Sequence, residues 1–147
     1  MKEIRYTAAG GVVVAEDRVL VLRRPSRGEV RLPKGKVEPG DDELDTALRE
    51  VREEGGFADL EVVVDLGTLT NEFDRLDEDG STIHMVRAEH YWLMRLTSPS
   101  RYQRPPEDEE EFLPDFLPVD VALEALTYDA EKEWVRRALA ALPAPTA

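Results

Sequence analysis

The stretch from residue 32 to residue 57 constrains the fold most, because its second half has the pattern of an amphipathic helix. It reads L-P-K-G-K-V-E-P-G-D-D-E-L-D-T-A-L-R-E-V-R-E-E-G-G-F. Apolar residues at i, i+3, i+4 and i+7 form one stripe: Leu44, Ala47, Leu48 and Val51. At roughly 100° per residue, a second stripe lies about 115° away and consists of three acids: Glu50, Glu53 and Glu54. The helix is therefore expected to bury one face and to present three carboxylates beside it.

The acidic stripe has an energetic cost that a cation would remove. Like charges at i and i+4 destabilise an isolated helix by roughly 0.2–0.5 kcal/mol per pair. Mg²⁺ binds carboxylate oxygens and keeps several of its own waters, so it suits such a stripe. Spacing alone leaves two interpretations open, a metal site and a solvated acidic face.

The residues around this helix resemble the signature of the Nudix hydrolases, G-x5-E-x7-R-E-U-x-E-E-x-G-U, in which U is bulky and apolar. The matching positions are Gly35, Arg49-Glu50-Val51, Glu53-Glu54 and Gly56-Phe57. One fixed position differs, because the first glutamate of the signature is Asp41 here. In the family that glutamate pairs with the arginine that Arg49 matches. The resemblance therefore implies an Asp41–Arg49 pair with a shorter carboxylate side chain.

The resemblance also implies a fold and a catalytic centre. The fold is the Nudix α/β/α sandwich, a mixed β-sheet with helices on both faces, formed by one domain over residues 1–147 with a frayed tail at 143–147. The activity is Mg²⁺-dependent hydrolysis, with Mn²⁺ as the alternative metal, of a nucleoside diphosphate linked to another group. The implied catalytic residues are Arg49, Glu50, Glu53 and Glu54. The implied metal ligands are Gly35, Glu50, Glu53, Glu54 and one acid of the run Glu107–Glu111, for which we take Glu110.

Composition excludes several other classes of function. The net charge of −13, from 19 basic and 32 acidic residues, would repel long nucleic acid. The absence of cysteine excludes disulfides and thiolate metal sites. Only His84 and His90 are available for a zinc site, and both are predicted to be sheet-face residues. With no signal-peptide pattern and no apolar run of about 18 residues, we expect a cytoplasmic protein that does not contact membranes.

A cluster of cations precedes the acidic helix. Six of the 19 positive charges fall within fourteen residues: Arg23, Arg24, Arg27, Arg31, Lys34 and Lys36. Such a cluster suits a small substrate with several phosphates, although solvated lysines are the alternative for Lys34 and Lys36. The predicted substrate-binding residues are Arg23, Arg24, Lys34, Lys36 and, in the closing L-T-Y-D, Tyr128.

The predicted substrate follows from the same segments. L-P-K-G-K-V-E-P-G together with L-T-Y-D resembles the small bacterial Nudix members that cut dinucleoside polyphosphates, so diadenosine tetraphosphate is the first choice. The alternatives are ADP-ribose and a noncanonical nucleoside triphosphate such as 8-oxo-dGTP. A different class is also open, a catalytically silent Nudix-fold protein that senses nucleotides. The predicted assembly is a monomer or a homodimer.

The rest of the chain predicts a sheet with one more main helix. Asp41 or Asp42 is expected to cap the acidic helix, and Gly55-Gly56 to end it. Gly10 and Gly11 indicate either a close backbone approach or a bulge. The expected strands are 6–15 and 19–22 as a hairpin, 60–69, 83–96 and 112–119. The expected connections are polar loops at 23–31, 70–80 and 97–111, followed by a helical turn at 120–126 and a helix from 129 or 130.

Overall fold

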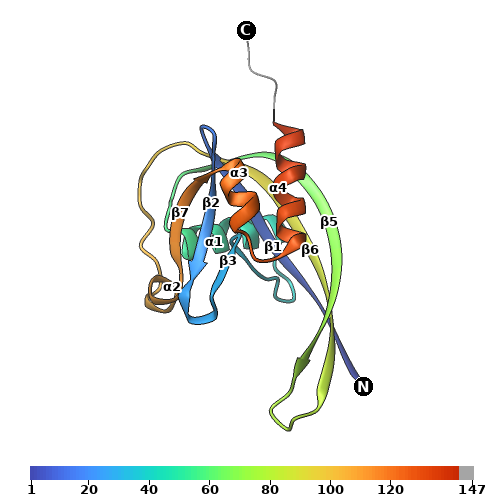
Figure 1. Ribbon diagram of the computed structural model, residues 1–147. Coiled ribbons are helices and arrows are strands. Elements are labelled where there is room, and N and C mark those ends of the chain that lie inside the picture. The colour runs from blue at the N-terminus through green and yellow to red at the C-terminus, as the bar shows by residue number, and fades with distance from the viewer. Residues whose placement is uncertain (143–147) are drawn as a thin grey trace.

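The computed structural model describes residues 1–142, which form one mixed sheet between helices (Figure 1). The strands are β1 (Lys2–Ala15), β2 (Arg18–Arg24), β3 (Glu29–Arg31), β4 (Lys34–Lys36), β5 (Leu60–Leu76), β6 (Thr82–Leu96) and β7 (Leu113–Pro118). The helices are the 3₁₀ turn η1 (Pro25–Arg27), α1 (Glu43–Gly55), α2 (Pro106–Glu111), α3 (Val119–Ala125) and α4 (Asp129–Ala141). The strand order is β3-β2-β1-β6-β5, with β4 paired to β1 and β7 paired to β2. Only the β1–β6 pairing is parallel among these residues.

Alternation along the central strands produces two cores, one on each face of the sheet. On β1, Val12 and Val14 pack toward α3 and α4, whereas Val13 packs toward α1. Successive strand residues point to opposite faces, so a strand that is covered on both sides needs a continuous apolar run. This explains the run of valines in β1, and it confirms the predicted α/β/α sandwich with helices on both faces.

Helix α1 begins and ends where the sequence indicates. The Asp42 carboxylate accepts a hydrogen bond from the Asp45 N–H at 3.0 Å, so Asp42 is the N-cap of the two candidates. Gly56 follows the helix with φ of 79°, and its N–H donates to the Arg52 carbonyl at 2.8 Å. These caps fix the register of the acidic stripe relative to the sheet.

Gly10 is needed for a close approach between β1 and β4. A Cβ at this position would lie 2.5 Å from the Pro33 carbonyl oxygen and 2.8 Å from the Lys34 Cβ. β1 pairs with β6 from Lys2 to Val14 without a register shift, so the close approach is confirmed and no bulge interrupts this pairing. The approach seats β4 directly against the centre of the sheet.

Two predicted polar loops are largely strand. The 23–31 loop contains the end of β2, the η1 turn and β3, which pairs with β2. β5 does not stop at residue 69 but continues to Leu76, and the turn to β6 is confined to residues 77–81. The polar residues of these segments led to the wrong prediction of loops. β5 has β6 on only one edge, so its polar side chains can face solvent or a pocket while the segment remains a strand. The resulting β5–β6 hairpin extends beyond the helices together with the N-terminal end of β1 (Figure 1).

The C-terminal third contains one further correction. The acidic run in the predicted 97–111 loop forms the short helix α2, which starts at Pro106 and has acids in its first turn. The other elements are confirmed, with β7 beside β2 and with Trp134, Val135 and Ala138 of α4 buried. The tail predicted at 143–147 lies outside the described residues. None of the helices in residues 1–142 is long and apolar enough to cross a membrane.

Candidate active site

The carboxylates of α1 lie against β4. A Cβ on Gly35 would overlap the Glu50 carboxyl group, so any side chain at this position would displace that carboxylate. One residue earlier, the backbone N–H of Lys34 donates to Glu54 Oε1 at 2.9 Å. Glu54 is buried, while Glu50 and Glu53 are half-buried. The structure thus brings Gly35 together with Glu50 and Glu54, as the signature predicts.

Burial and mutual repulsion make these acids weak. Burial raises the pKa of Glu54 to about 8, with Arg31 opposing the rise and the Glu50 charge adding to it. Burial likewise raises the pKa of Glu50 to about 7, opposed by Arg49 and reinforced by Glu53. A cation beside desolvated carboxylates that repel one another stabilises their charged forms. In metal-free protein near neutral pH, at least one of the two side chains, Glu50 or Glu54, is instead protonated.

The donor set fits a hard divalent cation. Across residues 1–142, no group of three or more His, Asp or Glu side chains lies close enough together to hold a metal ion. Mg²⁺ does not require such a group, because it is usually held by one or two carboxylates and retains several waters. Glu50, Glu53 and Glu54 supply oxygen donors on one flank of α1. The Gly35 carbonyl as an additional ligand stays a prediction.

The predicted partner of Arg49 is not the one observed. Its Nη1 lies 3.5 Å from Glu50 Oε1, and no ion pair joins it to Asp41 in the part of the chain that is described. Asp41 and Arg49 do border the same small depression near the start of α1. Asp41 is one methylene shorter than the glutamate of the signature, and Arg49 instead partly offsets the charge of Glu50.

We expect Asp41→Glu to be tolerated and to stabilise the protein by at most about 0.5 kcal/mol, since the longer side chain forms an exposed pair with Arg49. Urea denaturation in metal-free buffer measures this difference. In an Arg49→Gln background the gain should disappear. A loss of several kcal/mol would show that the loop has packed around the shorter side chain.

Helix α2 brings a different acid to α1 from the one predicted. Burial raises the pKa of Asp108, and the Glu53 charge is the next largest cause, so Asp108 faces the α1 carboxylates. Glu110 is exposed and is replaced by Asp108 as the candidate acid of this run. Arg104 connects α1 to α2, because its Nη1 donates to the carbonyls of Glu54, Asp108 and Phe112 at 3.3, 3.4 and 2.9 Å. Sequence spacing contains no signal for either contact.

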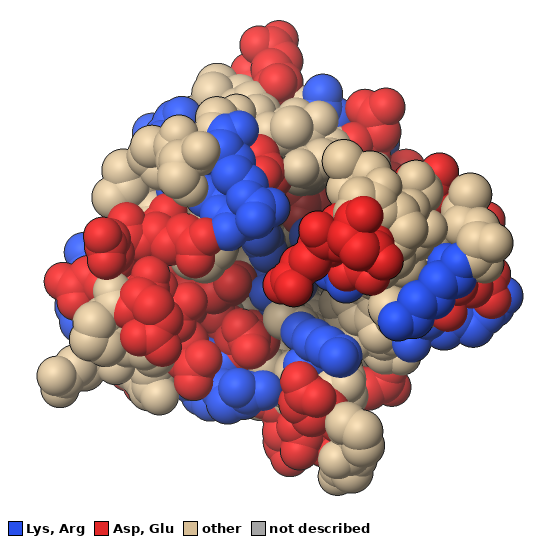
Figure 2. Space-filling view, turned by 90° about the horizontal axis from the view of Figure 1, so that it is seen from below, with Lys and Arg blue, Asp and Glu red and all other residues tan. Residues whose placement is uncertain are grey.

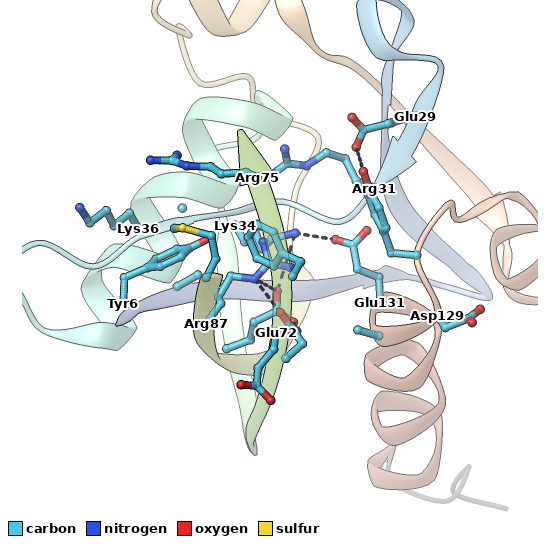
Figure 3. Close-up of a pocket in the computed structure, with 18 of the residues that line it drawn as sticks. Tyr6, Glu29, Arg31, Lys34, Lys36, Glu72, Arg75, Arg87, Asp129 and Glu131 are labelled. Atoms are coloured by element: carbon cyan, nitrogen blue, oxygen red, sulfur yellow. Dashed lines mark hydrogen bonds and ion pairs between the residues drawn. The ribbon is translucent and has the colours of Figure 1, made fainter. Parts of the chain in front are cut away.

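A pocket of about 1050 Å³ lies on the α4 side of the sheet, next to β4. Figure 2 shows basic side chains around a hollow on this face of the molecule, with acidic side chains beside them. Basic residues from η1 and from six strands line the pocket: Arg5, Arg24, Arg27, Arg31, Lys36, Arg75 and Arg87, together with Lys34. Figure 3 shows Arg31, Lys34, Lys36, Arg75 and Arg87 among the residues that line the pocket. Gly35 also lines it, so the pocket and the carboxylates of α1 meet at this glycine.

Part of the pocket lining is apolar. The strand register places Ile4 of β1 beside Met85 of β6, and Met85 beside Phe73 of β5. Tyr6 lies two residues further along β1 and also lines the pocket. The pocket therefore combines a cationic wall with an apolar and aromatic surface.

The predicted cations have different positions. Arg24 lines the pocket and forms an ion pair with Glu111, and Lys36 is an exposed lining residue. Arg23 lies outside the pocket and pairs with Asp115 at 3.4 Å. Arg23 is therefore removed from the candidate set.

Lys34 and Tyr128 both border the pocket, but each has a protein partner. Lys34 is only 8% exposed, and its Nζ lies 2.9 Å from Glu131 Oε2. The burial excludes the interpretation of Lys34 as a solvated lysine. The Tyr128 hydroxyl donates to Glu29 Oε2 at 2.6 Å, at the N-cap of α4.

Three further lining residues were not among the predicted substrate-binding residues: Arg31, Arg75 and Arg87. Arg75 and Arg87 belong to the β5–β6 hairpin, and Arg87 Nε donates to Asn71 at 3.1 Å. Arg31 is half-buried, with its guanidinium 5.2 Å from the centre of the Phe112 ring. Sequence proximity had grouped Arg31 with the other cations, but Arg75 and Arg87 are brought in only by the strand register.

The two histidines lie on β6, as predicted, and each contacts at least one acid. His90 Nε2 is 2.8 Å from Asp65 Oδ1, and the His90 ring stacks on Trp92 at 3.9 Å. His84 Nδ1 is 2.8 Å from Asp74 Oδ1.

Two sequences with similar segments are a mutator protein named MutT4 from Mycobacterium tuberculosis and a protein named as a DHNTP pyrophosphohydrolase from Lactococcus lactis. The first is 34% identical over 110 residues, which are 65% of this chain and 40% of the relative. The second is 42% identical over 50 residues, which are 34% of this chain and 30% of the relative. The matches thus span less than half the length of these relatives.

Solved structures share the fold over nearly the whole chain. The Ap4A hydrolase of C. elegans has a TM-score of 0.67 at 24% identity and covers 92% of this chain and 96% of its own. The dihydroneopterin triphosphate pyrophosphohydrolase of E. coli has a TM-score of 0.64 at 20% identity, covering 93% and 97%. At these identities the likeness shows the fold alone. The model of the NUDIX domain matches residues 5–138, which include the glycine, arginine and glutamates assembled around β4 and α1, so the chain belongs to the NUDIX domain family.

Proposed function

We propose that this chain is a Mg²⁺-dependent pyrophosphohydrolase of a nucleoside polyphosphate, and specifically of a dinucleoside polyphosphate such as diadenosine tetraphosphate. The observation that carries the proposal is the pocket, which joins a cationic wall to an apolar surface and meets the carboxylates of α1 at Gly35. A substrate with an anionic chain and a flat aromatic group matches both surfaces.

The size and lining of the pocket favour a long phosphate chain. Ligand pockets usually measure about 300–1,000 Å³, so a volume of about 1050 Å³ suits a large ligand. Phosphates would lie along Arg31 and Lys36, close to Gly35. A nucleobase would lie over Tyr6, where stacking on an aromatic ring contributes roughly 1–3 kcal/mol, whereas the Arg87 guanidinium already lies 5.0 Å from the centre of the Phe73 ring.

The protein side chains have separate roles in the proposed reaction. Glu50, Glu53 and Glu54 would hold the divalent cation, which would neutralise phosphate charge and lower the pKa of water. The Lys34 N–H orients Glu54, and Arg31 places positive charge beside it. Water oxygen attacks phosphorus, the bridging P–O bond breaks, and a nearby carboxylate accepts the proton of the water. Asp108 is a candidate for that acceptor, because its raised pKa indicates a partly desolvated acid facing Glu53.

A nucleoside triphosphate is the second candidate substrate. It is favoured by the 42% identity over 50 residues to the protein named as a DHNTP pyrophosphohydrolase, although that match covers 34% of this chain. ADP-ribose offers only two phosphates to the cationic wall and ranks third. The intact set of Glu50, Glu53 and Glu54 argues against a catalytically silent nucleotide sensor, and metal-dependent turnover would distinguish the two classes directly.

The test compares substrates with different numbers of phosphates. We expect Lys36→Ala and Arg75→Ala each to raise KM about tenfold for diadenosine tetraphosphate, which corresponds to about 1.4 kcal/mol, and less for ADP-ribose. Steady-state kinetics with product identification measures both effects, which should weaken at high salt because exposed charges are screened. Arg95→Ala is the matched control, since Arg95 pairs with Glu61 outside the pocket. Equal KM losses for long and short phosphate chains would remove the preference for dinucleoside polyphosphates and move ADP-ribose to first place.

A further inference from the structure

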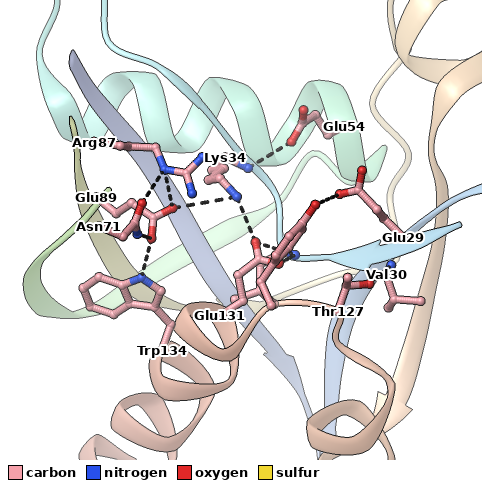
Figure 4. A network of polar contacts seen from close by, with 12 residues as sticks. Glu29, Val30, Lys34, Glu54, Asn71, Arg87, Glu89, Thr127, Glu131 and Trp134 are labelled. Carbon is pink, nitrogen blue, oxygen red and sulfur yellow. Dashed lines mark hydrogen bonds and ion pairs between the residues drawn. The ribbon is translucent and has the colours of Figure 1, made fainter. Parts of the chain in front are cut away.

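We infer that Glu131, in the first turn of α4, is a positioning residue that holds segment 32–34 so that the backbone N–H of Lys34 points at the Glu54 carboxylate (Figure 4). The inference rests on the proposed function in one respect, the role of Glu54 as a metal-binding carboxylate. It assigns a task to a residue about one hundred positions away in the chain from the loop that it holds.

The Glu131 carboxylate holds both ends of the segment. It accepts the backbone N–H of Leu32 at 3.2 and 3.3 Å through its two oxygens. It also accepts a hydrogen bond from Lys34 Nζ at 2.9 Å. Glu131 is 1% exposed, so water does not compete for these contacts. From the other side of the segment, the Pro33 carbonyl accepts the Gly11 N–H at 3.3 Å, which ties the segment to β1.

Lys34 connects the Glu131 carboxylate to the acidic helix α1. Its ammonium binds Glu131, while its backbone N–H donates to Glu54 Oε1 at 2.9 Å. A displacement of the segment toward or away from α4 would therefore break the hydrogen bond that orients Glu54. The contacts form a continuous path from α4 through β4 to α1.

The composition of the buried cluster favours a role in positioning over a role in stability. A second carboxylate, Glu89, lies 3.8 Å from the same ammonium and is fully buried. Glu89 is itself fixed by Asn71 at 3.0 Å and by Trp134 Nε1 at 3.3 Å. Buried ion pairs contribute little net stability compared with apolar residues of the same volume. Two rigid carboxylates around one ammonium do, however, restrict it to a single position.

Direct Mn²⁺ binding tests the inference without any substrate. Free Mn²⁺ is measured by electron paramagnetic resonance as the ion is titrated into wild-type protein, Glu131→Gln and Glu133→Gln. Loss of a residue that orients a metal ligand typically weakens metal binding about 10–100-fold, so we expect Glu131→Gln to raise the Kd about tenfold or more. Glu133→Gln is the matched control on α4, because Glu133 pairs only with Arg136 and Arg137 among the described residues. Wild-type affinity in Glu131→Gln would overturn the inference.

A double-mutant cycle shows whether Glu131 acts through Glu54. In a Glu54→Gln background, Glu131→Gln should change the Kd by less than about twofold, because the ligand that it orients is already gone. If the two losses instead multiply in full, Glu131 acts on the protein in another way and the inference is wrong.

Two controls keep the experiment decisive. If Glu131→Gln does not fold, the Lys34→Met, Glu131→Gln double variant removes both charges of the pair while keeping the Lys34 backbone N–H. It should fold and show the same weakening, and wild-type Mn²⁺ affinity in it would overturn the inference. Normal binding in Glu54→Gln alone would contradict the metal assignment of the proposed function, whereas weak binding there with normal binding in Glu131→Gln would contradict only the positioning role.

Discussion

Replacing Glu54 by glutamine is expected to lower kcat at least about a hundredfold at saturating Mg²⁺ and, in metal-free buffer, to stabilise the protein above pH 8. The expected kinetic loss follows from the position of Glu54 on the acidic stripe, where it is buried and oriented by the Lys34 N–H. Residues that only support a metal ligand typically contribute about 10–100-fold, so a ligand itself should contribute at least as much. Glutamine preserves shape and an acceptor oxygen but provides no charge for a cation.

The gain in stability follows from the raised pKa of Glu54. Burial raises this pKa from 4.5 to about 8 in the folded chain, whereas the unfolded chain keeps the ordinary value. The folded state therefore binds the proton more tightly, and the stability that this provides is fully present below pH 4.5 and is lost as the pH rises through about 8. Because one pKa unit corresponds to about 1.4 kcal/mol, glutamine should recover on the order of a few kcal/mol at pH 9.

Thermal unfolding in EDTA between pH 5 and pH 9, together with turnover at saturating Mg²⁺, measures both parts of the prediction. Glu53→Gln should lose turnover as well but gain less stability, because Glu53 is only half-buried. Glu61→Gln, at an exposed position on β5, is the control for charge alone. Near wild-type turnover in Glu53→Gln or Glu54→Gln at saturating Mg²⁺ would contradict the metal-ligand assignment of that residue.

The helical part of the site was predictable because its geometry is local. The spacing of Val51 and Glu54 on one helix fixes their relative directions, and Asp42 and Gly56 mark the ends of that helix. No distant contact is needed to know that one flank is buried and the next acidic. The fold class followed instead from the resemblance of these residues to the Nudix signature.

The rest of the site depends on contacts between distant segments. Asp108 replaces Glu110 because Arg104 binds carbonyls of both α1 and α2 and so sets which face of α2 meets α1. Arg75 reaches the pocket because β5 continues past residue 69 and pairs with β6. Neither the register of a polar edge strand nor a side chain bound to backbone carbonyls leaves a periodic pattern in the sequence.

Replacing Lys34 by alanine is expected to destabilise the fold by roughly 3–5 kcal/mol, the usual effect of removing one partner of a buried ion pair. Its ammonium lies 2.9 Å from Glu131 and 3.8 Å from Glu89, and both carboxylates are buried. Their charges would lose this partner, and the missing side chain would leave a cavity. Because about 1 kcal/mol shifts the melting temperature by roughly 2–4 °C in a protein of this size, the expected decrease is on the order of 10 °C.

Lys36→Ala is the matched control for this loss, since Lys36 lies two residues away at an exposed position and should change stability by no more than about 0.5 kcal/mol. The Lys34→Met, Glu131→Gln double variant should recover most of the loss, because both charges of the closest pair are then absent. Calorimetry and urea denaturation measure the three variants. A Lys34→Ala protein with unchanged stability and a raised KM would show instead that the ammonium faces the substrate, as its place among the clustered cations of the sequence first indicated.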